Sequence, residues 1–369
     1  MARAIHLAER GLYTTHPNPR VGCVLVRDGE MVGEGYHRRA GEPHAELNAL
    51  VMAGERAQGA TAYVTLEPCC HQGRTPPCSE GLIEAGVARV VVAMEDPNPQ
   101  VAGQGIEALR EAGIAVQTGL MEAQARALNP GFIKRMHQDL PWVRCKLAMS
   151  LDGRTSMASG ESQWITGEAA RQDVQRLRAR SDAIVTGIGT VLADDPSMNV
   201  RIGIEALYGV ESDAYRLQPL RVVLDPMLEI STEARLLHLP GCALVIGHEA
   251  APVERLNTLQ EAGVEVGQLP GDADHIDLDL VLRSLAGRQI NEVLIEAGPT
   301  LAGAALQAGA IDELIIYTAP HIMGDEARGL FRIPGLERMQ DRIGLRIEDL
   351  RMVGGDIRIT ARPEKITAA

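Results

Sequence analysis

Aromatic residues, long apolar runs and positive charge are all scarce in this chain of 369 residues. Phe, Trp and Tyr make up only 3% of the residues, which leaves few rings for stacking the bases of single-stranded nucleic acid. The formal net charge is −13, so the overall field of the protein disfavours nucleic acid and anionic membranes. No stretch approaches the roughly 18 consecutive apolar residues that span a bilayer. We therefore expect no nucleic-acid partner and no membrane partner.

The composition is that of a folded globular protein, with 45% apolar and 23% charged residues. Residues 1–13 mix charged and apolar side chains and contain no run that resembles the apolar core of a signal peptide. A cytoplasmic protein of about two to three domains is therefore expected. The net negative charge does not exclude a small phosphorylated ligand, because a few local arginines can hold its phosphate.

Strands and helices alternate in the first part of the chain. Residues 21–26 and 31–35 are joined by an Asp-Gly turn, which predicts a β-hairpin. Apolar spacing then predicts helices that alternate with strands, the helices at 44–57, 79–85 and 105–112 and the strands at 62–66, 89–94 and 114–118. This alternation predicts a three-layer α/β/α domain over residues 1–140.

The alternation breaks near residues 129–131 and 138–141 and resumes with a strand expected over 142–147. Further β-branched runs predict the strands of a second α/β domain over residues 141–363, at 183–186, 220–224, 243–246, 292–296 and 313–317. Residues 202–218 show no clear period, so we expect an irregular insertion there.

The most informative pattern of the first domain combines one histidine, one glutamate and two cysteines. His44-Ala45-Glu46 opens a predicted helix, Pro68-Cys69 follows a strand, and Cys78 follows Cys69 after eight intervening residues. One imidazole and two thiolates leave the fourth position of a tetrahedral zinc open for water. Zinc lowers the pKa of bound water, and a carboxylate that does not bind the metal, here Glu46, can carry the proton. The pattern is a modified form of the signature of zinc nucleobase deaminases, in which the two cysteines stand closer together.

The motif Pro68-Cys-Cys-His-Gln-Gly-Arg-Thr-Pro-Pro-Cys78, together with His44-Ala-Glu46 and Thr15-His-Pro-Asn-Pro-Arg-Val-Gly22, resembles a known family. It is similar to the deaminase half of the bifunctional riboflavin-biosynthesis deaminase/reductases, which share the long cysteine gap. The resemblance implies a cytidine-deaminase-like fold, zinc on His44, Cys69 and Cys78, and Glu46 as the proton carrier.

Two residues of this motif leave alternatives open. Cys70 stands where the family usually carries serine and places a second thiol beside the expected ligand. We expect Cys69 to bind the metal because it directly follows Pro68, as the motif requires. Arg74 lies in the loop before Cys78 and either holds a substrate phosphate or faces solvent.

The second domain has no Gly-x-Gly-x-x-Gly motif between a strand and a helix, so a standard dinucleotide-binding fold is not indicated. Its most informative segment is Glu296-Ala-Gly-Pro-Thr300, in which a predicted strand leads into an Ala-rich helix. Free backbone N–H groups at such a helix start form a plausible cradle for a phosphate. The same segment can also be an ordinary helix start.

This and other segments resemble the reductase half of the same family, which has a dihydrofolate-reductase-like fold and uses NADPH. The resemblance implies a set of cofactor-lining residues: Ala148, Trp164, Thr190, Asp194, Gly298, Pro299, Thr300, Leu301, Ala302, Gly303 and Ala304. It also implies a set of substrate-binding residues: Ser162, Arg178, Arg201 and Glu296. The two arginines suit the recognition of a phosphate. Arg178 also fits a solvated helix face.

The family implies a two-step enzyme with zinc and NADPH as cofactors. A zinc-dependent domain over residues 1–140 would deaminate 2,5-diamino-6-ribosylamino-4(3H)-pyrimidinone 5′-phosphate. An NADPH-dependent domain over residues 141–363 would then reduce the ribosyl chain to ribityl. The family also implies a homo-oligomer, either a dimer or a tetramer. Two alternatives are a nucleic-acid-editing zinc deaminase with an appended domain and a binding module in which the metal is structural.

Overall fold

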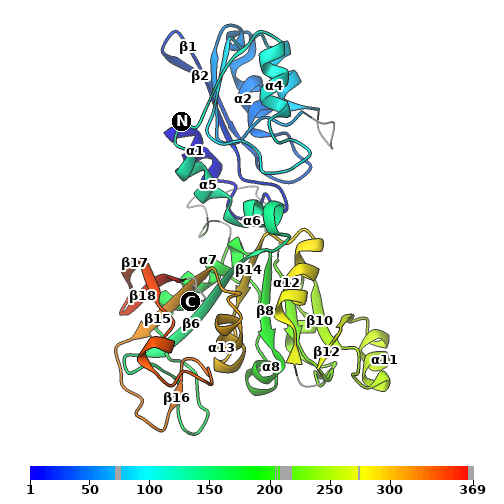
Figure 1. Ribbon diagram of the computed structural model, residues 1–369, viewed down its shortest axis with the longest axis vertical. Helices are drawn as coiled ribbons and strands as arrows, with labels where there is room; N and C mark the ends of the chain where they lie inside the picture. Colours follow the sequence, from blue (N-terminus) through cyan, green and yellow to red (C-terminus); the bar gives the residue numbers. More distant parts are fainter. Residues whose placement is uncertain (71–75, 204, 206, 208–217, 273–274, 365–369) are drawn as a thin grey trace. The chain divides into compact units, whose positions relative to one another are not determined.

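The computed structural model describes residues 1–70, 76–203, 205, 207, 218–272 and 275–364 (Figure 1). Two compact units make up the chain, and the boundary between them falls between Leu140 and Pro141. Arg74 and most of the insertion expected over 202–218 lie outside the described residues. Within the described residues, every helix is too short or too polar to cross a bilayer.

The first unit is built on a sheet of five strands in the order β2-β1-β3-β4-β5. The predicted hairpin is confirmed, because β1 and β2 pair in antiparallel fashion. β3, β4 and β5 run parallel to one another. The bounds of the strands are β1 (Gly22–Arg27), β2 (Glu30–Tyr36), β3 (Thr61–Val64), β4 (Arg89–Val92) and β5 (Ala115–Thr118).

Helices cover both faces of this sheet, which confirms the three-layer arrangement. α2 (Ala45–Ala53), α3 (Cys78–Glu84) and α4 (Gln104–Glu111) share one apolar core with β1, β3 and β4. α1 (Ala2–Glu9) packs on the opposite face. A Cβ atom at Gly33 or Gly35 of β2 would overlap a carbonyl oxygen of α2, so glycine lets α2 lie directly against the strand. This contact fixes the helix that begins next to His44.

Three short helices complete the unit. η1 (Gly54–Ala57) continues α2, whereas α5 (Glu122–Leu128) and α6 (Pro130–Gln138) follow the last strand, β5. The break expected at 129–131 is instead the start of α6, with Pro130 in its first turn. Proline is favoured there because the first turn of a helix leaves its N–H groups unbonded.

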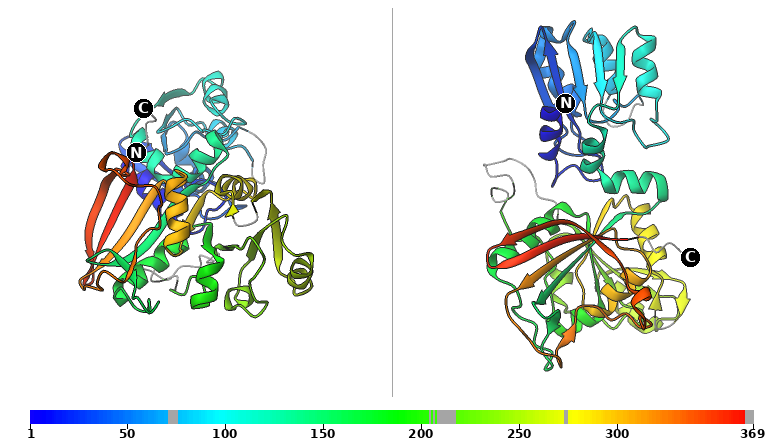
Figure 2. Two further views of the ribbon diagram at one scale, coloured as in Figure 1. Left: turned by 60° about the horizontal axis from the view of Figure 1, so that its bottom comes forward. Right: turned by 60° about the vertical axis from the view of Figure 1, so that its left-hand side comes forward.

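The second unit contains a sheet of nine strands in the order β11-β10-β9-β8-β14-β6-β15-β18-β17. The strands expected in this half are confirmed, and their neighbours from β11 to β15 are parallel. The bounds are β6 (Trp142–Ser150), β8 (Ala183–Gly187), β9 (Leu220–Leu224), β10 (Ala243–His248), β11 (Glu265–Leu269), β14 (Glu292–Ile295), β15 (Glu313–Ala319), β17 (Leu345–Val353) and β18 (Asp356–Pro363). The sequence analysis did not predict the antiparallel hairpin β17–β18, which extends the sheet beyond β15 (Figure 2).

Helices pack on this sheet in two apolar clusters. α7 (Glu168–Arg180) packs against β8, β14 and β15, and α8 (Ile188–Asp194) and α11 (Val253–Glu261) pack against β9 and β10. The remaining elements are α10 (Arg235–His238), α12 (Leu278–Gly287), α13 (Pro299–Gln307), η2 (Met339–Asp341) and the short strands β7 (Arg154–Ser156), β12 (Gly271–Asp272), β13 (His275–Ile276) and β16 (Arg328–Gly329). This mixed α/β architecture confirms the predicted fold class.

Candidate active sites

One histidine and two cysteines converge in the first unit. The Nδ1 atom of His44 lies 3.2 Å from Sγ of Cys78 and 3.5 Å from Sγ of Cys69. The three potential ligand atoms all lie within 4.8 Å of one another. His44 is the N-cap residue of α2, Cys78 begins α3, and Cys69 follows β3. The fold thus brings together side chains from three separate segments.

This donor set fits a zinc ion. Zinc bonds of about 2.3 Å to sulfur and about 2.0 Å to nitrogen place N and S about 3.5 Å apart in a tetrahedron. The observed separations of 3.2 and 3.5 Å from Nδ1 of His44 to the two sulfurs agree with that value. Three protein ligands leave one coordination position for water or substrate. The residues present therefore fit a catalytic zinc site.

Glu46 lies beside these ligands in the first turn of α2, where its side chain is only 3% exposed. Burial raises the pKa of Glu46 to about 7, although the charge of His44 acts in the opposite direction. A carboxyl group near neutrality can both accept and release a proton at physiological pH. The position suits a proton carrier between water and a leaving group.

The two thiols share a proton in the protein without metal. The Cys78 thiol donates a hydrogen bond to Cys69 and lowers the pKa of Cys69 to about 4, while the pKa of Cys78 is raised. Cys69 is therefore a thiolate near pH 7, and a bound cation would favour the loss of the second proton. The Sγ atom of Cys70 lies outside this cluster, 3.9 Å from Oε1 of Gln104.

Three buried polar residues near the cluster were not predicted from the sequence. His37 packs edge-on against His44 with ring centroids 5.1 Å apart, and burial lowers the pKa of His37 to about 4. Asp96 lies in the loop after β4, and burial raises its pKa to about 7. Glu67 is buried next to Pro68 and accepts four backbone hydrogen bonds. Of these three residues, only Glu67 could have been singled out from the sequence, because it directly precedes Pro68-Cys69.

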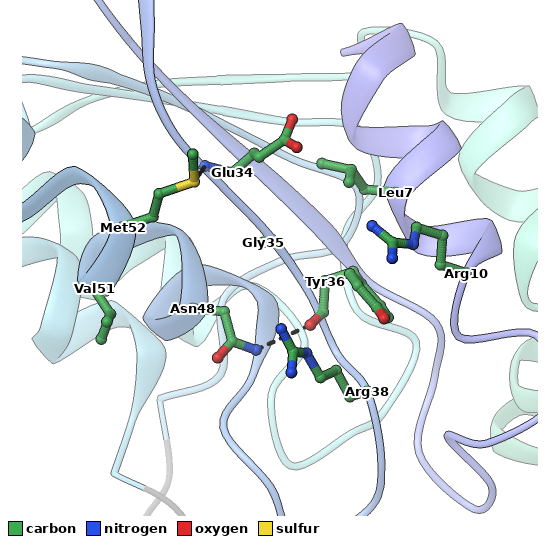
Figure 3. Close-up of a pocket in the computed structure, with 9 residues that line it drawn as sticks. All are labelled: Leu7, Arg10, Glu34, Gly35, Tyr36, Arg38, Asn48, Val51 and Met52. Carbon is green, nitrogen blue, oxygen red and sulfur yellow. Dashed lines mark hydrogen bonds between the residues drawn. The ribbon is translucent and has the colours of Figure 1, made fainter. Parts of the chain in front are cut away.

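A separate cavity of about 330 Å³ lies between α1, β2 and α2 (Figure 3). The guanidinium groups of Arg10 and Arg38 lie 4.7 and 5.7 Å from the centroid of the Tyr36 ring. The amide of Asn48 donates a hydrogen bond to the backbone oxygen of Tyr36. The described lining residues include none of the predicted site residues.

In the second unit, several predicted residues gather where the parallel strands end. Glu296 follows β14, Thr190 lies in α8 after β8, and Ala148 lies near the end of β6. The backbone N–H of Gly298 donates to Oγ1 of Thr190 over 3.3 Å. Open parallel α/β sheets bind their ligands at this edge, at the carboxyl ends of the strands.

Arg178 and Glu296 form a bidentate ion pair that is about nine-tenths buried. Nε of Arg178 lies 2.6 Å from Oε1 of Glu296, and Nη2 lies 2.9 Å from Oε2. Burial would raise the pKa of Glu296, but the charges of Arg178, Lys146 and Arg201 lower it. Arg201 is exposed and interacts electrostatically with both members of the pair. The structure thus groups three of the four predicted substrate-binding residues.

Lys146 is a further member of this group that the sequence analysis missed. It lies on β6, and burial lowers its pKa while the charge of Glu296 raises it. A buried lysine releases its proton more readily than a solvated one. No local motif marks Lys146, because its neighbour Glu296 is 150 residues away in the sequence.

The other predicted residues of this half are more dispersed. Trp164 is 69% exposed, and its ring lies 4.8 Å from the guanidinium carbon of Arg171. Asp194 is exposed at the end of α8, and Ser162 is half-buried. At the start of α13, the N-cap residue Gly298 and Pro299, Thr300, Leu301 and Ala304 are exposed or half-buried, whereas Ala302 and Gly303 are buried. A Cβ atom at Gly303 would overlap the backbone of Arg332, so this glycine allows a close packing contact.

Comparisons with known proteins agree with both halves of this description. Residues 1–94 match the family model "Cytidine and deoxycytidylate deaminase zinc-binding region", and residues 141–358 match "RibD C-terminal domain". The Riboflavin biosynthesis protein RibD of Escherichia coli (strain K12) is 53% identical over 362 residues, which cover 97% of this chain and 96% of that protein.

Solved structures are similar over the same length. Acinetobacter baumannii RibD, form 1, superposes with a TM-score of 0.89 and 49% identity, covering 99% of this chain and 98% of that one. A diaminohydroxyphosphoribosylaminopyrimidine deaminase/5-amino-6-(5-phosphoribosylamino)uracil reductase from Thermotoga maritima gives a TM-score of 0.84 at 31% identity, with 99% and 97% coverage.

These similarities extend over both units, and neither alternative from the sequence analysis accounts for them. The zinc-binding deaminase region and the NADPH-using type of reductase domain confirm the two predicted cofactors. The chain therefore belongs to the RibD family, the bifunctional deaminase/reductases of riboflavin biosynthesis.

Proposed function

We propose that residues 1–140 deaminate 2,5-diamino-6-ribosylamino-4(3H)-pyrimidinone 5′-phosphate and that residues 141–363 reduce the ribosyl chain of the product to ribityl. The convergence of His44, Cys69 and Cys78 beside the buried Glu46 is the observation that carries this proposal. The Thermotoga maritima relative is named for both activities, and this supports the choice of substrate.

In the deamination, C2 of the pyrimidinone loses its amino group and gains the oxygen of water, and ammonia leaves. His44, Cys69 and Cys78 would hold the zinc, which supplies activated water near neutral pH when bound. Glu46 accepts a proton from that water and delivers it to the departing amino group. Its burial and its pKa of about 7 suit both transfers.

In the reduction, NADPH would supply a hydride to C1′ of the ribosyl group. The bond between C1′ and the ring oxygen breaks, so that this oxygen needs a proton. We assign the proton to Lys146, which is half-buried on β6 beside Glu296 and has a lowered pKa. Arg201 has an exposed guanidinium group that can bind the substrate phosphate, while Glu296 anchors Arg178. Thr190 and the start of α13 would line the cofactor.

A coupled assay on the purified protein tests the two assignments. Ammonia release and NADPH absorbance are followed with the pyrimidinone substrate, with and without a zinc chelator. Chelation should stop ammonia release while NADPH is still consumed with substrate that has already been deaminated. Ammonia release that survives complete removal of zinc would overturn the assignment of His44, Cys69 and Cys78.

We further propose a cytoplasmic protein that assembles into a homo-oligomer, a dimer or a tetramer. The sequence similarity to the family supports this proposal. Light scattering coupled to size-exclusion chromatography measures the assembly directly, and a monomer at all concentrations would exclude it.

A further inference from the structure

Glu67 is a buried carboxylate that neither of the two proposed reactions uses. It lies after β3, directly before Pro68-Cys69, and its side chain is 3% exposed. Oε1 accepts backbone hydrogen bonds from Gly105 and Ile106 over 2.9 and 3.1 Å. A buried charge is costly unless it is paired or hydrogen-bonded. The donors around Glu67 therefore have to stay in place for the fold to hold it there.

Glu67 caps α4 from outside the helix. α4 begins after Gly103, which has a φ of 82° and no side chain that could accept from the first turn. The N–H groups of a first turn have no partner within their helix. Gly105 and Ile106 donate to Glu67 instead, and the negative charge suits the positive end of the helix dipole. Because Glu67 and Gly105 are 38 residues apart, this cap joins two distant segments.

The second carboxylate oxygen binds the loop that connects β4 to α4. Oε2 accepts from the backbone N–H groups of Asp96 and Gly103 over 3.1 and 3.0 Å. The backbone N–H of Glu67 itself donates to the carbonyl oxygen of Met94 over 3.0 Å. One residue thus joins the segment that leaves β3 to the segment that leaves β4 and to the start of α4.

The start of α4 lies directly against the peptide that links Pro68 to Cys69. A Cβ atom at Gly105 would lie 2.0 Å from the carbonyl oxygen of Pro68, so only glycine leaves room for this approach. The ring of Pro68 also fixes its own φ. The hydrogen bonds of Glu67 therefore determine where the backbone of Cys69 lies.

The start of α3 holds the other side of Cys69. The backbone N–H and the hydroxyl of Ser79 both donate to the carbonyl oxygen of Cys69 over 3.1 Å. The backbone N–H of Cys78 donates to the Cys69 sulfur over 3.4 Å. Cys69 is thus held between the first turns of two helices, and Glu67 fixes one of them.

We infer that Glu67 is a positioning residue that keeps the Cys69 sulfur at ligand distance from His44 and Cys78. This inference rests on the ligand set proposed above. His44 and Cys78 stand at the starts of α2 and α3, which share one apolar core. Cys69 instead follows a strand end and depends on the hydrogen bonds around it. A metal site needs ligand distances within about 0.2 Å of their usual values, so a small shift of this backbone weakens it.

Glu67→Gln tests this role, because an amide offers one acceptor oxygen and turns a donor toward backbone N–H groups. The affinity for zinc, measured by competition with a chromophoric chelator, should fall by about 10- to 100-fold, as for other groups that orient metal ligands. Glu107→Gln makes the same chemical change on the exposed side of α4 and should bind zinc like the wild type. Wild-type affinity in Glu67→Gln would overturn the inference.

The stability of the zinc-free protein separates positioning from a general structural role. A lower denaturation midpoint combined with wild-type zinc affinity would show that Glu67 only supports the fold. That result counts against the inference. Weaker zinc binding by a variant that circular dichroism shows to be folded under the assay conditions is the expected result.

Cobalt(II) in place of zinc reports on the geometry of the site, because its visible absorption depends on the number and arrangement of its ligands. The absorption of cobalt bound by Glu67→Gln should be shifted or weakened relative to the wild type, whereas Glu107→Gln should reproduce the wild-type spectrum. A wild-type spectrum in Glu67→Gln would mean that the Cys69 sulfur keeps its place without the carboxylate, which contradicts the positioning role.

A measurement on the wild-type protein avoids the risk that Glu67→Gln fails to fold. Coupling between two sites is reciprocal, so zinc at Cys69 should also strengthen the hydrogen bonds that Glu67 accepts. Zinc should slow hydrogen exchange at the N–H groups of Gly105 and Ile106 more than at that of Ile5, near the start of α1. Equal slowing in both helices, or none in α4, would overturn the inference.

Cys69→Ser distinguishes a failure of this inference from a failure of the ligand set. Zinc binding that survives in Cys69→Ser would overturn the ligand set, and the positioning role with it. Loss of zinc in Cys69→Ser, combined with wild-type affinity in Glu67→Gln, would overturn the positioning role alone. Loss in the first variant and weaker binding in the second is the result that we expect.

Discussion

The two halves of this chain build their sites in different ways. In the first unit, His44, Glu46, Cys69 and Cys78 come from two short motifs, and the donor atoms of His44, Cys69 and Cys78 lie within 4.8 Å of one another. In the second unit, Lys146, Arg178, Arg201 and Glu296 come from distant segments and interact through charge. A metal needs few ligands of defined type, whereas a hydride transfer depends mainly on the positions of two bound molecules. Motifs therefore reveal the first kind of site more readily than the second.

Removing Glu46, the proposed proton carrier of the first site, should give the largest effect. Glu46→Gln keeps the shape of the side chain but cannot accept a proton, so ammonia release should fall by about 10²- to 10⁴-fold. Zinc content, measured by elemental analysis, should stay at the wild-type level. NADPH oxidation with deaminated substrate should also be unchanged, and its loss would show that the two sites are not independent.

The corresponding change in the second site is Lys146→Met. The expected result is a fall in NADPH oxidation of about 10²-fold, because the ring oxygen loses its proton source while Arg178 still neutralises Glu296. Single-turnover measurements with saturating cofactor separate the chemical step from binding. Wild-type rates in this variant would exclude Lys146 as the proton donor. The second unit would then contribute to the reduction mainly by positioning the substrate and the cofactor.

The smallest effect is expected at Cys70, beside Cys69, the proposed zinc ligand. Cys70→Ser should leave zinc affinity and ammonia release within about 2-fold of wild type, because the Cys70 sulfur points to Gln104. Cys69→Ser serves as the comparison and should lose the metal. Weaker zinc binding in Cys70→Ser would mean that the neighbouring sulfur takes part in the site.

The hairpin β17–β18 shows why part of the fold could not be predicted. The strands expected in the second unit were marked by β-branched runs such as 220–224 and 313–317, which are buried on both faces. β17 alternates charged and apolar residues, and a bulge between Ile347 and Asp349 interrupts the alternation. A shift of one residue exchanges the two faces of a strand, so a pattern that is broken by a bulge does not define its faces.

The sequence by itself predicted the cluster of His44, Cys69 and Cys78, the proposed role of Glu46 as proton carrier and the division into two α/β halves. These features are local, because short stretches of sequence contain the ligand residues and the periodicity of each strand. Only the tertiary structure decided that Lys146 lies beside Glu296, that Glu67 joins three segments, and that the apolar face of β17–β18 points outward. Each of these depends on pairing between distant parts of the chain, which forms only when the sheets and their helices pack together.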